Sequence, residues 1–414
     1  MSLNPCAVLQ QISPDRQAWF DAVPETPGFI LDEKRLAHNL DLMNEIGSVS
    51  GCRMLYSIKA CPFTGLLQRM PGLLDGFSVS SLFEARLAHE VLAGAGGLHI
   101  TTPGLRREEM AEIAGLCETV SFNSLNQLQR LAPLLGGRAK AGLRINPQLS
   151  FLEDPRYDPC RFHSKLGAPL PQVAAQWRSG RLSARGLSGL HLHTNFGSSS
   201  FEPLQRTTAH LEAHLPGLVA EVEWVNLGGG YLFQASDDLR TLFRVIDNIR
   251  REWGALVYLE PGSAVVDDAV MLVASVIDRF ESDGKSIAVL DTSVNHLPEV
   301  FEYQRPPRLL NEEGDGNHAT ILAGSTCLSG DLFGEYRFSR PLEIDDRLVF
   351  TNVGAYTLAK ATRFNGHNLP SIYCLDGNGD SILLKAYGYD DYRRQWSESG
   401  TRHRQPKPGA GQVD

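Results

Sequence analysis

The chain has 414 residues, of which 42% are hydrophobic and 21% are charged, and it carries a formal net charge of −9 at pH 7. This composition is typical of a globular protein that is long enough for two domains. The excess of acidic residues argues against nucleic-acid binding and is compatible with a small cationic substrate. No apolar run approaches the roughly 18 residues needed to cross a bilayer, and no charged-then-apolar leader opens the chain, so we expect no membrane association.

The seven cysteines are odd in number and scattered along the chain, and no two of them form a CxxC pair. This usage is typical of reduced thiols and not of a disulfide framework or a zinc site. We therefore expect a cytoplasmic protein without a metal centre.

Eight apolar, β-prone runs alternate with helical stretches in the first two thirds of the chain. The runs are residues 54–59, 76–80, 98–102, 119–123, 141–146, 187–194, 224–228 and 257–260. Helical periodicity separates most of them, as in residues 82–92, 106–116, 125–135 and 239–253. Strands that alternate with helices pair in parallel, and eight such units predict a TIM-like (β/α)8 barrel at residues 33–265. The alternative at this point is a doubly wound open sheet.

The pattern changes after Gly262. Strand-like runs with little helical periodicity follow at residues 264–278, 285–292, 319–323, 347–351 and 381–387, which predicts an antiparallel β domain at residues 266–395. The segment 1–32 contains a short strand, residues 28–32, that we assign to this second domain. Residues 396–414 are predicted to be disordered, because this stretch is largely polar and rich in glycine and proline.

Lys59 ends the first β-prone run, in the segment MLYSIKACP, and a proline-bearing loop follows it. A lysine at this point would lie at the carboxyl mouth of the barrel, where barrel enzymes keep their chemistry. A lysine whose pKa shifts on burial is also the usual amine for a Schiff base. The alternative is an ordinary solvated lysine.

Other predicted strands also end in residues that are suited to bind a cofactor or to take part in catalysis. In chain order these are Arg144, His193, Gly228, Gly229, Gly230 and Glu260. Glycines let backbone N–H groups approach a phosphate, and barrels often hold phosphate after strands seven and eight. A lysine, a phosphate cradle and a carboxylate at one mouth suggest pyridoxal 5'-phosphate, with the carboxylate at the pyridine nitrogen. Glycine for a tight turn, and a purely structural histidine, are the alternatives.

Six further stretches carry a resemblance to a known family. They are residues 80–87 (SSLFEARL), 122–125 (FNSL), 142–147 (GLRINP), 224–230 (WVNLGGG), 327–331 (CLSGD) and 364–372 (FNGHNLPSI). In these stretches the chain resembles the fold-type III pyridoxal-phosphate decarboxylases, and among them most of all the carboxynorspermidine decarboxylases. The resemblance implies a fold like that of alanine racemase and ornithine decarboxylase. It also implies a homodimer with active sites at the subunit interface.

The resemblance assigns roles to individual residues. Lys59 is implied to bind the cofactor aldehyde, and Cys327 is implied to protonate the carbon that loses CO2, reaching the site from the neighbouring subunit. The residues expected around the cofactor are Lys59, Arg144, His193, Gly228, Gly229, Gly230, Glu260 and Tyr356. Those expected near the substrate are Asn195, Glu299, Asp331 and Glu335.

The chain also departs from the family pattern. After His193 it reads TNFGSSS, where the carboxynorspermidine enzymes carry a more acidic run, and residues 291–299 look one residue shorter than their counterpart. Ser263 and Leu328 stand where diaminopimelate decarboxylases have arginine and glutamate. Those two differences argue against a diaminopimelate substrate.

The expected reaction is removal of the α-carboxylate from carboxynorspermidine or carboxyspermidine. The same chemistry on an aminocarboxypropyl-bearing intermediate of a specialised pathway is the alternative. A racemase is a rival, although the resemblance implies that racemases place arginine where this chain has Glu260. A catalytically inactive pyridoxal-phosphate-binding relative is a further rival, which the joint presence of Lys59, Glu260 and Cys327 disfavours.

Overall fold

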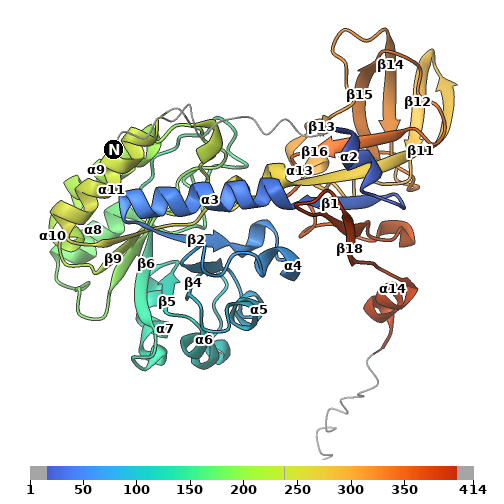
Figure 1. Cartoon of the computed structure of the whole chain (residues 1–414). Helices are drawn as coiled ribbons and strands as arrows, with labels where there is room; N and C mark the ends of the chain where they lie inside the picture. Colours follow the sequence, from blue (N-terminus) through green and yellow to red (C-terminus); the bar gives the residue numbers. More distant parts are fainter. Residues whose placement is uncertain (1–15, 237, 399–414) are drawn as a thin grey trace, which may run out of the picture.

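The computed structural model describes residues 16–236 and 238–398. The first large unit is a closed barrel, because the parallel sheet that runs β5-β4-β3-β2-β10-β9-β8-β6 returns to its start through a β5–β6 pairing. Its strands are β2 (Arg53–Ser57), β3 (Gly76–Val79), β4 (Gly97–Thr102), β5 (Thr119–Phe122), β6 (Lys140–Asn146), β8 (Gly189–His191), β9 (Trp224–Asn226) and β10 (Leu256–Leu259). The predicted eight-stranded barrel is confirmed, and the open sheet is excluded (Figure 1).

Helices follow the barrel strands along the chain. They are α4 (Thr64–Leu67), α5 (Leu82–Leu92), α6 (Met110–Leu116), α7 (Leu125–Leu131), α8 (Leu170–Arg178), α9 (Glu202–His214), α10 (Pro216–Val219), α11 (Leu239–Asn248) and α12 (Ser263–Val266). Ser81 and Ser124 cap α5 and α7, because each hydroxyl accepts a hydrogen bond from the backbone N–H three residues later, at 3.1 Å. The predicted helix at residues 82–92 coincides with α5. The one predicted at 239–253 ends instead in a π-helical turn, Ile249–Trp253.

Trp224 fills part of the barrel interior, and two glycines make room for it. A Cβ atom at Gly189 would lie 2.0 Å from the Trp224 ring, and one at Gly142 would lie 2.4 Å from it. Both positions are on strands beside or near β9, and Trp224 itself is buried. The two small residues therefore let one large residue fill the interior at normal packing density.

The second unit is a mixed sheet. Its order is β15-β14-β12-β11-β1-β17-β18, with β16 beside β11 and β13 beside β16. The strands are β1 (Gly28–Asp32), β11 (Val270–Ser282), β12 (Lys285–Leu290), β13 (Arg308–Leu309), β14 (His318–Ala323), β15 (Leu332–Phe338), β16 (Arg347–Thr351), β17 (Ser371–Leu375) and β18 (Ser381–Lys385). The predicted second β domain is confirmed, and most of its strand pairs are antiparallel. The β1–β17 and β12–β14 pairs are parallel, which makes the sheet mixed. Long connections join the strands of both pairs, and a parallel pair requires such a crossover.

Three local predictions need correction. Residues 264–269, predicted as the start of a strand, form α12 and a 3-10 turn (Asp267–Ala269), because this apolar run is buried against helix α3 (Glu33–Ser50) instead of joining the sheet. The strands β15 and β17 were not predicted. Trp396, the first residue of the tail predicted to be disordered, is ordered and ends helix α14 (Tyr389–Trp396). The remainder of the predicted tail from residue 399 onward lies outside the described part of the chain.

The long helix α3 (Glu33–Ser50) runs from the second domain into the barrel, since it directly joins β1 to β2 (Figure 1). Asp32 begins it by accepting a hydrogen bond from the backbone N–H of Arg35 at 3.0 Å, and Gly51 ends it with φ 70°. In the middle of the helix the Asn39 amide donates to the Val265 carbonyl at 3.0 Å and to Asp268 at 2.7 Å. The helix is thus tied to the segment that follows the last barrel strand.

The remaining helices are α2 (Arg16–Asp21) and α13 (Glu299–Tyr303), the latter in the second domain. Within residues 16–236 and 238–398, no helix combines the length and the apolar character needed to cross a membrane.

We expect Gly189→Ala to lower the free energy of unfolding by about 1–3 kcal/mol, because the added methyl group overlaps the Trp224 ring. Gly115→Ala is the matched control, since its Cβ would meet nothing within 4 Å on helix α6. That change should be neutral or stabilise by up to about 1 kcal/mol. Denaturant unfolding measures both; equal stability of the two variants would contradict the packing argument.

Candidate active site

Lys59 lies just beyond strand β2 and not at its last position as predicted. The strand ends at Ser57, and residues Ile58–Ala60 form a single 3-10 turn. Two backbone bonds hold this turn in place: Ser57 N–H donates to the Pro261 carbonyl at 2.9 Å, and Tyr356 N–H donates to the Ala60 carbonyl at 2.7 Å. The turn is therefore anchored to the end of the last barrel strand on one side and to the second domain on the other.

Lys59 lines a cavity of about 310 Å³ at the carboxyl ends of the barrel strands. The segments after β8, β9 and β10 contribute to its wall, and so does the second domain. From the barrel come Ser57, Lys59, His193, Phe196, Gly197, Gly230, Tyr231, Leu232, Glu260, Gly262 and Ser263; from the second domain come Asp267, Glu299, Tyr303, Arg305, Asn352, Ala355 and Tyr356. The structure brings several of the predicted site residues together in this one cavity: Lys59, His193, Gly230, Glu260, Glu299 and Tyr356.

The Lys59 amino group is the candidate nucleophile. Its burial lowers the pKa, the positive charge of Arg144 lowers it further, and Glu260 and Glu84 act in the opposite direction. We find no hydrogen bond or ion pair of this amino group with any residue that the structure describes. A lysine with a lowered pKa and no protein partner is suited to form an imine with a carbonyl compound.

Glu260 is a buried carboxylate with fixed partners. The Asn226 amide donates to its Oε1 at 2.7 Å, and His191 Nε2 lies 3.6 Å from its Oε2, too far for a hydrogen bond. Burial alone would raise the pKa of Glu260, but the neighbouring His191 and the positive charge of Lys59 outweigh this effect and lower the pKa below the ordinary value. The carboxylate is therefore ionised throughout the physiological pH range.

His193 is held as a neutral imidazole. The Gly229 N–H donates to its Nδ1 at 3.1 Å, so Nδ1 is an acceptor and the neutral ring carries its proton on Nε2. Burial, assisted by the charges of Lys59 and Arg144, lowers the pKa of His193 well below its ordinary value. A neutral ring in this fixed orientation suits the predicted stacking on a flat cofactor.

The turn at residues 228–230 requires glycine for geometric reasons. Gly228 and Gly230 have φ of 70° and 90°, and a Cβ at Gly229 would lie 2.1 Å from the Glu260 carbonyl. The N–H of Gly228 already donates to Asn226 Oδ1 at 2.8 Å, and that of Gly229 to His193. Only the Gly230 N–H has no such partner among the described residues, so the predicted phosphate contact rests on Gly230 and not on the other two glycines.

Other predicted site residues lie outside the cavity wall. Arg144 is buried in β6 and acts on Lys59 through its charge. Asn195 is buried, and its side chain accepts a hydrogen bond from Phe196 N–H at 2.9 Å. Glu335 is exposed on β15 and forms an ion pair with Lys285. In the single chain, therefore, neither Asn195 nor Glu335 is placed to contact a substrate in this cavity.

Cys327 is exposed and does not line the Lys59 cavity of its own chain. Its backbone N–H donates to Asn365 Oδ1 at 3.0 Å. Asp331, predicted at the substrate, is buried and accepts hydrogen bonds from Ser293 Oγ at 2.9 Å and from Val294 N–H at 2.8 Å. The structure thus places Asp331 as the residue that ties the Cys327 loop to a neighbouring loop.

Sequence analysis missed two groups at the cavity. One is aromatic: Phe196 stacks on Tyr157 with ring centres 5.5 Å apart, and Tyr303 lies 4.8 Å from Tyr157 and 6.0 Å from Phe196. Tyr303 follows Glu299 by four residues on α13, so helical spacing would have found it. The other is Asp267, which had been placed inside a strand.

These features together define a class of protein. A (β/α)8 barrel that carries a second β domain holds three features at its mouth: a lysine with no hydrogen-bond or ion-pair partner among the described residues, an ionised carboxylate and a glycine turn. They fit pyridoxal phosphate, because the lysine amine is free to bind an aldehyde and the carboxylate is charged to pair with a protonated pyridine ring.

Comparisons with known proteins support the conclusion that the site fits pyridoxal phosphate. The sequence model described as "Pyridoxal-dependent decarboxylase, C-terminal sheet domain" matches residues 77–354. A carboxynorspermidine/carboxyspermidine decarboxylase of Herminiimonas arsenicoxydans is 31% identical over 369 residues, covering 89% of this chain and 98% of that protein. The chain therefore belongs to the pyridoxal-dependent decarboxylase family.

Two further relatives show which members of the family this chain is similar to. A carboxyaminopropylagmatine decarboxylase of Synechocystis is 33% identical over 376 residues, covering 89% of this chain and 95% of that protein. The crystal structure of a carboxynorspermidine decarboxylase from Campylobacter jejuni, complexed with norspermidine, superposes with a TM-score of 0.81 at 30% identity. It covers 90% of this chain and all of the other.

Asp267 and Glu299 give the site a pH-dependent component. Burial, and after it the neighbouring Asp268, raises the pKa of Asp267 to about 7. Burial, and after it Asp267, raises the pKa of Glu299 to about 7. Hydrogen bonds from the Ala355 backbone and the Asn352 side chain lower the pKa of Asp267, and Arg308 lowers it further. Lys360 lowers the pKa of Glu299, and Glu302 raises it.

Because both pKa values are raised on folding, the folded chain takes up protons between the ordinary values of 3.8 and 4.5 and about 7. The resulting stability is fully present below that window and is lost as the pH rises through about 7. We expect Asp267→Asn to gain stability relative to the wild type as the pH rises from about 4 to about 7, by at most about 1.4 kcal/mol per pH unit. Denaturant unfolding across this range measures it.

Asp247→Asn is the matched control, because Asp247 lies on the surface of α11 and pairs with Arg251 at 3.2 Å. Its stability should follow that of the wild type across the same pH range. If the stability of Asp267→Asn also followed that of the wild type across this pH range, the result would contradict the argument.

Proposed function

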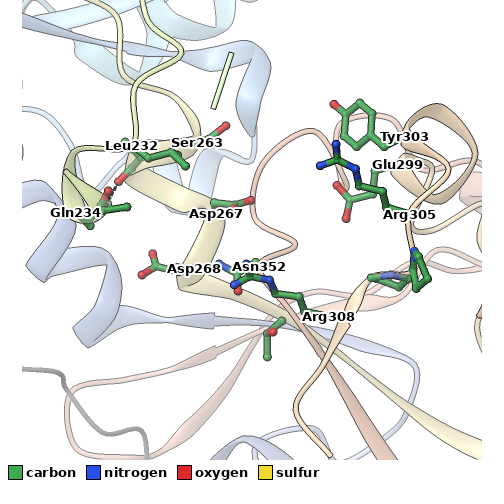
Figure 2. Close-up of a pocket in the computed structure, with 15 residues that line it drawn as sticks. Leu232, Gln234, Ser263, Asp267, Asp268, Glu299, Tyr303, Arg305, Arg308 and Asn352 are labelled. Carbon is green, nitrogen blue, oxygen red and sulfur yellow. Dashed lines mark hydrogen bonds between the residues drawn. The ribbon is translucent and has the colours of Figure 1, made fainter. Parts of the chain in front are cut away.

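We propose that this protein removes the α-carboxylate of a carboxylated triamine, carboxynorspermidine or carboxyspermidine, with pyridoxal phosphate as cofactor. The observation that carries the proposal is the joint presence of Lys59 and the ionised Glu260 in one cavity. Asp267 and Glu299, which line this cavity together with Arg305 (Figure 2), offer carboxylates to a substrate that carries a cation away from its reacting end. Relatives with the corresponding printed activities, aligned over most of both chains, support the same substrate class.

Each of the site residues would have its own role in the reaction. Bound pyridoxal phosphate supplies the electron sink that makes loss of CO2 possible. Lys59 would hold the cofactor by its aldehyde until the substrate amine replaces it, and would then be free to move a proton. Glu260 would keep the pyridine nitrogen protonated, His193 would cover one ring face, and the Gly230 N–H and Tyr356 would contact the phosphate.

The ionised Glu260 also favours decarboxylation over racemisation. A carboxylate keeps the pyridine ring protonated and so deepens the electron sink, whereas an arginine at that position would weaken it. Because the pKa of Glu260 is lowered, this effect is present at every pH at which the enzyme would work.

We also propose that the protein acts as a homodimer in which Cys327 delivers the final proton to the α-carbon in the neighbouring subunit. Its position supports this role, since it is exposed and lies outside its own cavity, yet its loop is tied down by Asn365 and Asp331. An exposed but ordered loop is suited to contact a second chain.

Three further proposals concern the whole chain. We keep the domain boundaries at residues 32 and 265. The cysteines that the structure describes are free, which supports a cytoplasmic location. The acidic net charge supports the expectation that the protein binds neither nucleic acid nor membranes.

The proposal is tested by supplying carboxynorspermidine and carboxyspermidine to the cofactor-loaded protein and following norspermidine and spermidine by mass spectrometry. We expect conversion by the wild type, and a loss of at least about 10³-fold in Lys59→Ala because the cofactor loses its attachment. Lys140→Ala, which removes a surface lysine paired with Glu223, is the control. Cofactor-loaded wild-type protein that converts neither substrate would refute the assignment.

The location of Cys327 is tested by co-expressing Lys59→Ala and Cys327→Ala subunits. If each active site uses one residue from each chain, random pairing restores about a quarter of the wild-type activity, because half of the dimers carry one intact site. Each variant expressed alone is the control and should be nearly inactive. Mixed dimers no more active than the average of the two controls would show that both residues act within one chain.

A further inference from the structure

The carboxylate of Glu260 faces a buried histidine to which no role has yet been assigned. His191 is the last residue of β8, and only 2% of its surface is exposed. The strand register places it directly beside Asn226 on β9. Asn226 donates to Oε1 of Glu260 at 2.7 Å, and Nε2 of His191 lies 3.6 Å from Oε2. The two neighbours on the barrel wall therefore face one carboxylate oxygen each.

The other ring nitrogen of His191 is held from a different part of the barrel. Oγ1 of Thr101, on β4, lies 3.0 Å from Nδ1 of His191. Because β4 pairs with β3 and β5 while β8 pairs with β6 and β9, this contact crosses the barrel interior. The imidazole is thus oriented by two separate strands, its own and β4.

Electrostatics selects the tautomer of this imidazole. If Nδ1 of His191 carried the proton, the lone pair of Nε2 would face the ionised Glu260. If Nε2 carries it, an N–H faces the anion and the Thr101 hydroxyl donates to Nδ1, so this tautomer is favoured. The ring is neutral, because burial lowers the pKa of His191, and the charges of Arg144 and Lys59 lower it further against the opposing effect of Glu260.

The Nε2 atom of His191 lacks a hydrogen-bond partner in the part of the chain that the structure describes. A buried donor without a partner costs about 1–3 kcal/mol, which favours a closer approach of Glu260. Hydrogen bonds in active sites are often long before a ligand binds and shorten in the complex. The ring of His99, also on β4, packs 4.3 Å from that of Tyr258, so the interior here is closely filled and a hydrogen bond is stronger than in water.

We propose that His191 is a positioning residue for the reaction: its Nε2–H, oriented by Thr101, holds the second carboxylate oxygen of Glu260. Each carboxylate oxygen has two acceptor sites, so bonds from His191 and Asn226 leave sites for the pyridine nitrogen. A carboxylate held at both oxygens keeps one orientation and retains the proton on that nitrogen. The inference rests on the proposed function and adds to it the group that orients Glu260.

The first test follows the protonation of the cofactor ring and needs no turnover. His191→Leu removes the donor at similar volume, whereas His191→Gln offers an amide nitrogen at about the place of Nε2. Pyridoxal phosphate isotope-labelled at the ring nitrogen is bound to each variant, and nuclear magnetic resonance reports the proton on that nitrogen as the pH is raised. We expect the proton to be lost at least about one pH unit earlier in His191→Leu than in the wild type, and His191→Gln to restore most of the difference.

The second test is turnover of carboxynorspermidine. We expect kcat of His191→Leu to fall about 10- to 100-fold while KM stays within about threefold, because the lost contact acts on the cofactor ring and not on substrate binding. Thr101→Val keeps the side-chain shape and should lie between His191→Leu and the wild type. Thr207→Val is the matched control, since its hydroxyl bonds to the Pro203 carbonyl within α9, and it should equal the wild type.

The outcomes separate this inference from the proposed function. A ring nitrogen and a kcat unchanged in both His191→Leu and Thr101→Val would overturn the positioning role and leave the decarboxylase assignment standing. If His191→Leu does not fold, Thr101→Val decides by the same two measurements. Wild type in which the variants shift the ring protonation, but which converts neither carboxynorspermidine nor carboxyspermidine, would refute the proposed function and uphold the role of His191. Wild type that binds no pyridoxal phosphate would overturn both.

Discussion

The buried negative charge of Glu260 is the constraint on which the active site depends. A carboxylate in the interior of a barrel is tolerable only if fixed donors and cations compensate it. Asn226 supplies a hydrogen bond at 2.7 Å, and the charge of Lys59 and the neighbouring His191 favour the ionised form. The same environment lowers the pKa of Lys59 through burial, so one arrangement produces both a permanent anion and a reactive amine.

Close packing at the barrel mouth keeps these groups in place. The glycine turn of residues 228–230 lies so near the carbonyls of Leu192, Asn195 and Glu260 that side chains cannot be accommodated there. Two of its N–H groups orient Asn226 and His193, the residues that contact Glu260 or would cover the cofactor. The turn is therefore a structural support for the site as well as a candidate phosphate contact.

The acids Asp267 and Glu299 have a different character, because burial and mutual repulsion raise their pKa values and the nearby cations Arg308 and Lys360 offset this only in part. Protonation near neutral pH relieves their repulsion. A cationic substrate would relieve it in another way, by supplying the missing charge. Stability and binding thus oppose each other at this point, as is common where a site is shaped for a ligand and not for the empty protein.

The sequence by itself determined the barrel, since the alternation of strands and helices is local, and it located Lys59, Glu260 and the glycine turn at strand ends that must converge. It did not determine the parallel pairings of β1 and β12, which join segments far apart in the chain. Nor did it reveal Asp267, whose apolar neighbours favour a strand until burial against α3 makes them helical. Tertiary structure alone decided that Asp331 and Asn195 are tied to the backbone while Asp267 and Phe196 line the cavity. The reason is physical: a side chain's role depends on which distant groups satisfy it, and that information lies in contacts between segments and not in the order of residues.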